Sequence, residues 1–200
     1  MLLMSFGMVA LVKERSEWRY QQAAAVDALT GLGNRRCLNE NLERDFRNAC
    51  RFGKSLAVVM IDADSFKAYN DLYGHLDGDA CLRAIAGALQ GGLLRRDDLV
   101  LRYGGEEFVV LLPNTTAAEA VQVAERLRLA VRGLGLAHAG REGGVVTISL
   151  GVAVMEPGQV IKDAASLLGA ADRALYKAKK LGRDRTVCCT EPLYETSPSA

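Results

Sequence analysis

A pair of glycines between two short apolar runs limits what this chain can fold into more than any other feature. Residues 99–101 and 109–112 are apolar and rich in strand-forming side chains, and Gly104 and Gly105 lie between them. Such a pattern predicts a β-hairpin, because glycine accepts the positive φ angles of a tight turn and lets another group approach the backbone closely.

The tip of this predicted hairpin carries two adjacent carboxylates, Glu106 and Glu107. Neighbouring negative charges repel each other, but a turn that faces solvent tolerates them, so one interpretation is a polar hairpin tip. The other is a site for a divalent cation, because hard cations prefer carboxylate oxygens. From these residues alone, both interpretations stand.

The rest of the chain alternates strands and helices around the hairpin. We expect strands at residues 55–61, 145–154 and 185–189, and helices at residues 35–52, 66–72, 79–89, 117–132 and 163–180. Asn34 and a threonine of residues 115–116 are expected to cap helices, and Gly53 to end one. The pattern predicts an α/β domain with a mixed central sheet flanked by helices.

Composition excludes some classes of protein. Two hundred residues, half of them hydrophobic, suit one domain with short extensions. A formal net charge of +1 gives no general attraction to nucleic acid, so no nucleic-acid partner is expected. The five cysteines lack metal-ligand spacing and indicate free thiols in a reducing compartment. The absence of a Gly-x₄-Gly-Lys-Ser/Thr motif disfavours a P-loop enzyme.

Both ends of the chain are expected to lie outside the domain. Residues 1–12 are almost wholly apolar, but a membrane span needs about 20 apolar residues. We interpret the run as the cytoplasmic end of a truncated transmembrane helix, which the basic residues after it favour, or as a helix that docks on a partner. Residues 13–26 are expected to be a helical linker, residues 27–188 a cytoplasmic domain and residues 189–200 a disordered tail.

A second carboxylate is expected near the hairpin. Asp62 follows the predicted strand at residues 55–61, and if that strand neighbours the hairpin, Asp62 and Glu106 converge. Such a pair could hold Mg²⁺, whose coordination is usually completed by phosphate oxygens and water. A bound ion would polarise a phosphate and lower the pKa of an attacking hydroxyl. The alternative is that Asp62 and Asp64 merely end a strand.

Several motifs together resemble the GGDEF domains, the diguanylate cyclases. Gly-Gly-Glu-Glu-Phe at residues 104–108 is similar to the family's signature in its Glu variant. Further stretches resemble the family's Asp-x-Leu-Thr-Gly-Leu-x-Asn-Arg-Arg (residues 27–36), Asp-x-Asp-x-Phe-Lys (62–67), Asn-Asp-x-x-Gly-His-x-x-Gly-Asp (70–79) and Tyr-x-Ala-Lys-x-x-Gly-Arg-Asn (176–184). The resemblance spans roughly residues 27–187 and implies the palm-like fold of nucleotidyl cyclases, with the hairpin in the active site.

The resemblance also implies roles for the charged residues. Asp62 and the carbonyl of Ala63 would bind Mg²⁺ or Mn²⁺, Glu106 would bind metal and help to deprotonate a ribose 3′-hydroxyl, and Glu107 would hold a second ion. Lys67 matches a lysine that steadies the triphosphate, which suits phosphoryl-type transfer because such reactions depend on positioning and charge neutralisation. A solvated surface lysine is the alternative for Lys67.

Other residues match the family's nucleotide contacts. Asn70 and Asp79 match its guanine readers; a carboxylate can accept from guanine N1–H and N2–H₂, and adenine would leave these groups unpaired. His75 carries over as a substrate contact, or is a satisfied loop histidine. Phe66, Gly104 and Gly105 complete the substrate site that the resemblance implies.

Phosphate and regulatory contacts are implied further along the chain. Lys179 and Arg183 match phosphate contacts, but Asp184 stands where asparagine is usual, and a carboxylate near phosphates is mildly unfavourable. Arg95 and Asp98 match an inhibitory Arg-x-x-Asp site, and Arg126 aligns with an arginine that completes this site from another domain. A charged loop is the alternative, although arginine can grip phosphate and stack on guanine.

The function implied is diguanylate cyclase activity, in which two GTP give cyclic di-GMP and two pyrophosphates. Because the product has two-fold symmetry, two copies of the domain are expected to face each other, with cyclic di-GMP as both product and inhibitor. Two alternatives remain: a catalytically silent receptor for GTP or cyclic di-GMP on the same fold, and a nucleotidyl cyclase with another substrate.

Overall fold

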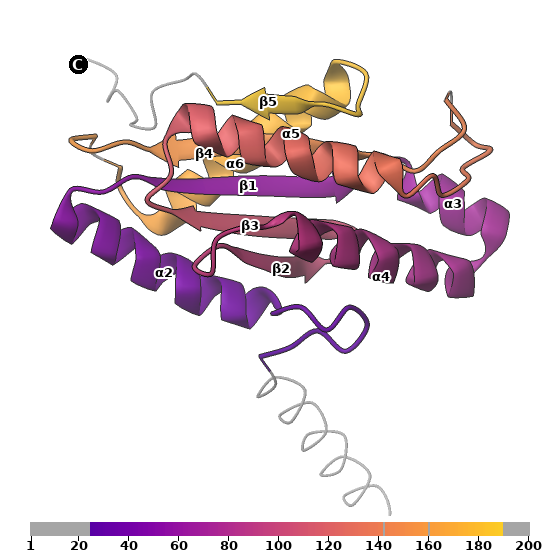
Figure 1. Ribbon diagram of the computed structural model, residues 1–200, viewed down its shortest axis with the longest axis horizontal. Coiled ribbons are helices and arrows are strands. Elements are labelled where there is room, and N and C mark those ends of the chain that lie inside the picture. The colour runs from indigo at the N-terminus through magenta and orange to yellow at the C-terminus, as the bar shows by residue number, and fades with distance from the viewer. Residues whose placement is uncertain (1–24, 142, 160, 190–200) are drawn as a thin grey trace, which may run out of the picture.

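The structure is a computed structural model that describes residues 25–189 except residues 142 and 160. The elements follow the predicted alternation (Figure 1). In chain order they are α2 (Arg35–Phe52), β1 (Leu56–Ala63), α3 (Phe66–Tyr73), α4 (His75–Gly92), β2 (Leu99–Gly104), β3 (Glu107–Pro113), α5 (Ala117–Gly133), β4 (Ile148–Met155), α6 (Ala164–Lys180) and β5 (Thr186–Cys188).

The five strands form one mixed sheet in the order β2-β3-β1-β4-β5. The central strand β1 is antiparallel to both of its neighbours, β3 and β4, while β5 runs parallel to β4 at one edge. Every residue of β1 and β4 is buried, because helices cover both faces of the sheet. This arrangement confirms the predicted fold class.

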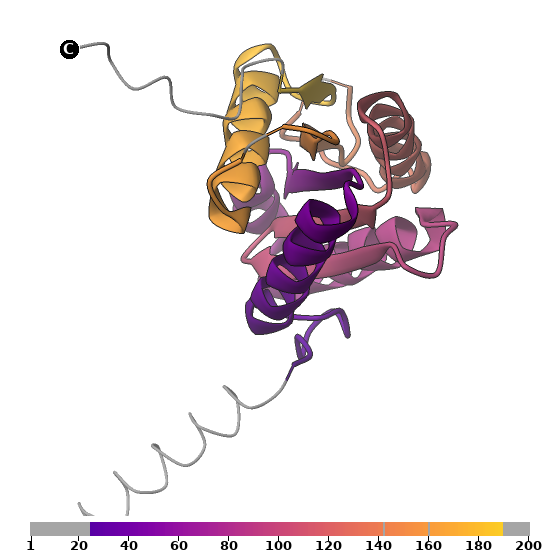
Figure 2. The ribbon, with the colours of Figure 1, turned by 90° about the vertical axis from the view of Figure 1, so that its left-hand side faces the viewer.

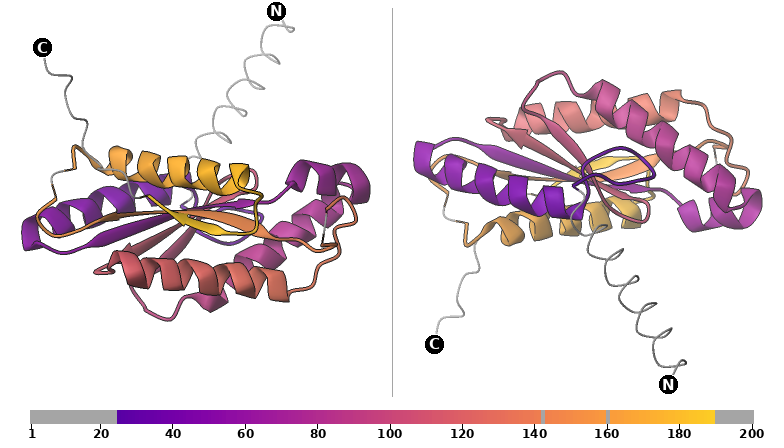
Figure 3. Two further views of the ribbon diagram at one scale, coloured as in Figure 1. Left: turned by 90° about the horizontal axis from the view of Figure 1, so that it is seen from above. Right: turned by 90° about the horizontal axis from the view of Figure 1, so that it is seen from below.

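The helices form two layers, one on each face of the sheet (Figures 2 and 3). Buried side chains of α3, α4 and α5, such as Ile85 and Leu127, pack on one face. Those of α2 and α6, such as Leu42 and Leu167, pack on the other. The loop after β1 and the hairpin turn between β2 and β3 lie at the same end of the sheet, as the antiparallel pairing of β1 with β3 requires.

The predicted caps are confirmed. The Asn34 side chain accepts hydrogen bonds from the amides of Arg36 and Cys37 at the start of α2, and Gly53 ends the helix with φ of 60°. Thr116 forms a capping box with Glu119 at the start of α5.

Three predicted boundaries were wrong by a few residues. Strand β1 extends through Ala63, so Asp62 lies in the strand rather than after it. Strand β4 begins at Ile148 rather than at residue 145. Helix α4 begins at His75 rather than at residue 79, because Gly78 packs inside its first turns instead of interrupting them.

The predicted terminal segments lie almost entirely outside the described residues: all of residues 1–12, the linker apart from residues 25 and 26, and the tail apart from residue 189. Among the helices that the structure describes, none has the length and apolar character needed to cross a membrane.

Candidate active site

The C-terminal end of β1 and the tip of the β2–β3 hairpin meet, as the convergence of Asp62 and Glu106 requires. In the antiparallel register Asp62 lies opposite Glu107, and the Ala63 amide donates a hydrogen bond to the Glu106 carbonyl, with N and O 3.2 Å apart. Gly105 has a φ of 55°, a left-handed conformation that favours glycine at the turn. The carboxylates of the hairpin and the strand therefore belong to one site.

A lysine far along the sequence from Asp62 reaches this site. The Lys179 ammonium on α6 lies 2.7 Å from Asp62 Oδ2. Burial raises the pKa of Asp62 to about 6; Lys179 acts in the opposite direction, and the negative charges of Glu106 and Glu107 add to the increase. Burial also raises the pKa of Glu107, again opposed by Lys179. Lys179 is thus a counter-ion for Asp62 and Glu107, whose pKa values it lowers against the effect of burial.

The donors at this end of the sheet are oxygen atoms, the kind of ligand that Mg²⁺ accepts. Among residues 25–189, as far as they are described, no three histidine, cysteine, aspartate or glutamate side chains lie close enough to hold an ion by themselves. Mg²⁺ usually takes one or two protein carboxylates and completes its shell with water and substrate phosphate. Asp62 and Glu106, with the adjacent Ala63 carbonyl, supply such a partial set of oxygen ligands.

Arg102 holds the hairpin tip in place by contacting both Gly105 and Asp27. Its guanidinium donates to the Gly105 carbonyl at 3.0 and 2.7 Å and pairs with Asp27 at 2.9 and 3.1 Å. Both charged side chains are mostly buried, at 13% and 22% exposure. This pair was not predicted from the sequence, although Asp27 opens one of the motifs quoted above and Arg102 lies two residues before the Gly-Gly pair.

Helix α3 and the first turns of α4 bring the predicted guanine readers together. Asn70 packs so closely on Gly78 that a Cβ at position 78 would lie 1.8 Å from Asn70 Oδ1 and 3.3 Å from the Phe66 ring. Asn70 Oδ1 is buried and has no hydrogen-bond partner. Asp79 is half-buried and His75 exposed, one helical turn apart. The need for glycine at position 78 was not predicted from the sequence.

The residues expected to meet phosphates occupy different surroundings. Lys67 is exposed on α3, next to the buried Phe66. Arg183 lies in the turn after α6 with φ of 64°. The following residue, Asp184, directs its carboxylate to Arg128 and Arg132 of α5. The expected unfavourable charge at Asp184 is therefore balanced within the protein.

The predicted regulatory residues Arg95 and Asp98 lie in the loop that follows the C-terminal end of α4, remote from Asp79 near its start. Arg95 contacts the Thr115 hydroxyl at 3.2 Å and Glu119 at 3.4 Å, and its side chain is half exposed. Burial raises the pKa of Asp98, opposed by Arg95 and Arg126, and one carboxylate oxygen of Asp98 has no hydrogen-bond partner. Arg126 on α5 donates to the Gly92 carbonyl at 2.8 Å.

A cavity of about 490 Å³ lies next to this regulatory loop, and its lining does not include Asp62, Glu106 or Glu107. Arg96 and Asp97 line it from the loop, and residues of α2 such as Asn48 line it from the other side. None of the residues expected to bind substrate or metal borders it.

Comparison with known proteins agrees with this geometry. Residues 24–185 match the family described as "Diguanylate cyclase, GGDEF domain". The chain is 42% identical over 165 residues to diguanylate cyclase DgcP of Pseudomonas aeruginosa, covering 82% of this chain and 24% of that protein. It therefore spans about a quarter of that relative's length.

Solved structures share the fold. The GGDEF domain of DgcB from Caulobacter crescentus, solved in complex with c-di-GMP, aligns with a TM-score of 0.76 and 31% identity over 84% of this chain and 97% of that one. The active GGEEF domain of a diguanylate cyclase from Vibrio cholerae aligns with a TM-score of 0.69 and 33% identity over 80% and 99%. With the matching family extending from the start of the Asp27 motif to the turn that carries Arg183, this chain belongs to the GGDEF diguanylate cyclase family.

Proposed function

We propose that this chain is a diguanylate cyclase domain that condenses two GTP into cyclic di-GMP and two pyrophosphates. One observation carries the proposal: Asp62, the Glu106–Glu107 hairpin and Lys179 meet at one end of the sheet, with Lys179 2.7 Å from Asp62. Two oxygen ligands for a metal beside a cation for phosphate are the parts that transfer of a nucleotidyl group needs. The domain works in the cytoplasm, where GTP is available.

In the proposed reaction the 3′-hydroxyl oxygen of each GTP attacks the α-phosphorus of the other. Two new P–O bonds form, the two bonds to pyrophosphate break, and each hydroxyl proton passes to a base. Since each domain holds one GTP, two copies face each other in a homodimer for turnover. Asn70 and Asp79 hold the guanine, and the half-buried Asp79 carboxylate is the acceptor for its N1–H and N2–H₂ groups.

Asp62, the Ala63 carbonyl and Glu106 would hold Mg²⁺ or Mn²⁺, with Glu107 beside them for a second ion. A bound ion would supply charge stabilisation at the phosphate and a lower pKa for the attacking hydroxyl. The chain's own residues do the rest. Glu106 accepts the proton of the 3′-hydroxyl, while Lys67, Lys179 and Arg183 neutralise the triphosphate. The Lys179 ammonium exchanges its contact with Asp62 for one with phosphate when substrate enters.

We further propose that cyclic di-GMP inhibits the domain at Arg95 and Asp98, with Arg126 contributed to a neighbouring copy. The guanidinium of Arg95 is half exposed, so a phosphate could contact it in place of Glu119. Asp98 is buried and helps to hold Arg95 through its negative charge. These residues lie at the end of α4 remote from Asp79, so inhibition would not compete with GTP.

Product analysis tests the main proposal. Purified protein is incubated with Mg²⁺ and either GTP or ATP, and the products are separated and identified. We expect cyclic di-GMP with GTP and no cyclic product with ATP. The turnover rate should fall by orders of magnitude in Glu106→Gln, which keeps the shape of the side chain but removes its charge. Glu43→Gln, an exposed change on α2, is the matched control and should leave the rate unchanged.

Each other outcome has a clear meaning. GTP binding without turnover by the dimeric wild type would indicate a receptor instead of an enzyme. A product from ATP would indicate a nucleotidyl cyclase of different specificity. Normal turnover by folded Glu106→Gln protein would remove Glu106 from the mechanism.

A further inference from the structure

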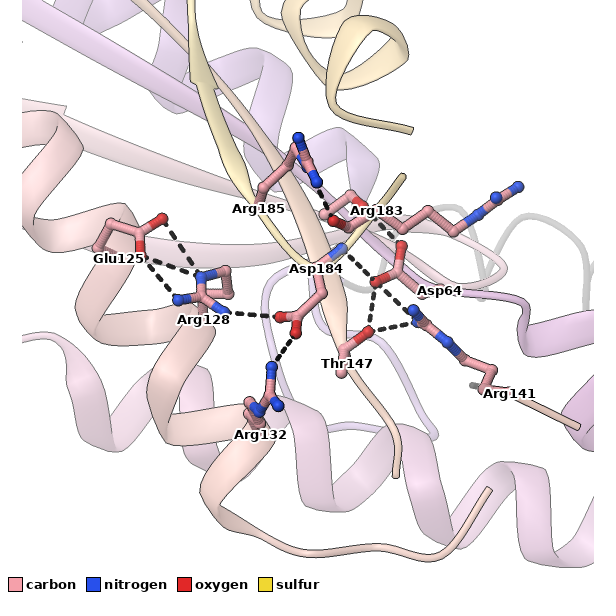
Figure 4. Close-up of polar contacts among 10 residues, drawn as sticks. Asp64, Glu125, Arg128, Arg132, Arg141, Thr147, Arg183, Asp184 and Arg185 are labelled. Atoms are coloured by element: carbon pink, nitrogen blue, oxygen red, sulfur yellow. Dashed lines mark hydrogen bonds and ion pairs between the residues drawn. The ribbon is translucent and has the colours of Figure 1, made fainter. Parts of the chain in front are cut away.

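Asp64, two residues beyond Asp62, is the centre of a buried polar cluster (Figure 4). Its side chain is fully buried, and it accepts hydrogen bonds from the Thr147 hydroxyl just before β4 and, at 2.6 Å, from the Ser149 hydroxyl in β4. Arg141 pairs with it at 2.9 Å, and the main-chain amide of Asp184 donates to it at 3.1 Å. With both oxygens engaged in this way, Asp64 ties the end of β1 to the turn after α6.

Asp184 continues this connection to a third element. Its carboxylate accepts from Arg128 at 2.7 Å and from Arg132, both on α5. Figure 4 shows Asp184 between these arginines and Asp64, with the Arg183 side chain pointing away from α5. The turn that carries Arg183 is therefore held by its main chain on one side and by the Asp184 carboxylate on the other.

The backbone of this turn needs such support. Arg183 and Asp184 both have positive φ, at 64° and 45°, although neither is glycine. Left-handed conformations of non-glycine residues are unfavourable and persist where the surroundings determine them. The turn also closes onto the end of α6, since the Arg183 amide donates to the Ala178 carbonyl at 3.1 Å, next to Lys179. A displaced turn would therefore move both Lys179 and Arg183.

The charges of this cluster are matched. Three carboxylates (Asp64, Asp184 and Glu125) face three guanidinium groups (Arg128, Arg132 and Arg141). Because the positive groups lie directly against Asp184, its carboxylate adds little repulsion toward a nearby polyphosphate. This matching explains how an aspartate is accommodated beside an arginine expected to bind phosphate.

We propose that Asp64 and Asp184 are positioning residues for the triphosphate of GTP. They hold the 181–185 turn against β1 and α5, and so place Arg183 and Lys179 at the correct distance from Asp62. This inference rests on the proposed function, because it assumes that a nucleoside triphosphate occupies the site. Neither residue touches the substrate; both act through Arg183 and Lys179.

The test uses Arg132→Glu, because Arg132 is half exposed and faces Asp184, so the new carboxylate would repel Asp184 and shift the turn. Affinity for a GTP analogue with a non-cleavable α–β bridge is measured by calorimetry with Mg²⁺, and affinity for guanosine by competition. We expect analogue binding to weaken about tenfold, the effect of losing one charge-assisted contact, while guanosine binding stays unchanged. In turnover, KM should rise more than kcat falls.

A double-mutant cycle tests whether the effect of Arg132→Glu on analogue binding acts through Asp184 or through a general change of surface charge. Asp184→Asn removes the carboxylate but keeps the main-chain amide that donates to Asp64, and we expect about threefold weaker analogue binding. In this background Arg132→Glu should have little further effect, because no carboxylate remains to be repelled. Arg47→Glu, the same change at an exposed site on α2, should leave binding close to that of wild type.

Three results would overturn the inference: analogue binding by Arg132→Glu no weaker than by Arg47→Glu, an effect of Arg132→Glu that persists in the Asp184→Asn background, or an equal loss of guanosine binding. A wild-type protein that binds no GTP would refute the proposed function, and this inference with it. Normal GTP binding by wild type together with an unaffected Arg132→Glu variant would refute this inference alone.

Discussion

Replacing Asp62 by asparagine should make the metal-free domain more stable at neutral pH while removing its activity. Burial raises the pKa of Asp62 from 3.8 to about 6, even with Lys179 beside it. At about 1.4 kcal/mol per pKa unit, ionising this carboxyl in the fold costs about 3 kcal/mol at pH 8. Asparagine has nearly the same shape, is not charged, and can still accept a hydrogen bond from Lys179.

The pH dependence follows from the sign of the change. Because the fold favours the protonated carboxyl, the stability that Asp62 contributes is fully present below about pH 4 and is lost as the pH rises through about 6. The free energy of unfolding of Asp62→Asn should therefore exceed that of wild type by about 1 to 2 kcal/mol at pH 5 and by about 3 kcal/mol at pH 8. At pH 8 this corresponds to a gain in Tm of about 6–12 °C.

Urea unfolding without divalent cations, followed by circular dichroism at several pH values, measures this difference. Asp71→Asn, an exposed change on α3, is the control and should show no pH-dependent gain. With Mg²⁺ and a non-cleavable GTP analogue, wild type should gain stability by ligand binding and Asp62→Asn should gain much less. Equal stability of the two proteins at pH 8, or a difference that does not change with pH, would show that burial of Asp62 is not unfavourable.

Three further predictions concern neighbouring parts of the site. Gly78→Ala should displace Asn70, because the added Cβ would overlap its side-chain oxygen, and so lower the preference for GTP over ATP in nucleotide titrations; an unchanged preference would place guanine recognition elsewhere. Arg102→Ala should destabilise the domain by about 2 kcal/mol in urea and reduce kcat, since the hairpin tip loses its contact with Asp27; normal kcat would show that the hairpin holds its own shape. Arg95→Ala should abolish inhibition by added cyclic di-GMP at unchanged kcat, whereas inhibition that persists, or that GTP relieves in wild type, would contradict a separate inhibitory site.

Local patterns were enough to predict the fold class, whereas the meeting of Asp62 with the hairpin was predicted only on the condition that their strands are neighbours. Apolar runs, a Gly-Gly turn and helix caps act over a few residues, so the sequence displays them directly. Contacts between distant residues could not be predicted in this way. Asp64 meets Thr147 and Ser149 across 83 and 85 residues, and Asp184 meets Arg128 across 56, so nothing near these aspartates indicates their partners.

Helix α4 illustrates a second limit. Its propensity is weakened at Gly78, so sequence alone suggested a start after that residue. In the fold the helix starts at His75, and Gly78 lies inside it against Asn70. Glycine is required at position 78 because a side chain there would overlap Asn70.

The ion pair between Lys179 and Asp62 also bears on how the domain is made. During synthesis β1 and the hairpin leave the ribosome before α6. Asp62, Glu106 and Glu107 are therefore present before Lys179, the partner of Asp62, has been added. Until α6 docks, the nascent sheet end carries mutually repelling acids without this lysine. A chain cut before residue 179 would lack the counter-ion although both strands of the hairpin are complete. The charge of these acids is therefore balanced by Lys179 only after α6 has docked on the sheet.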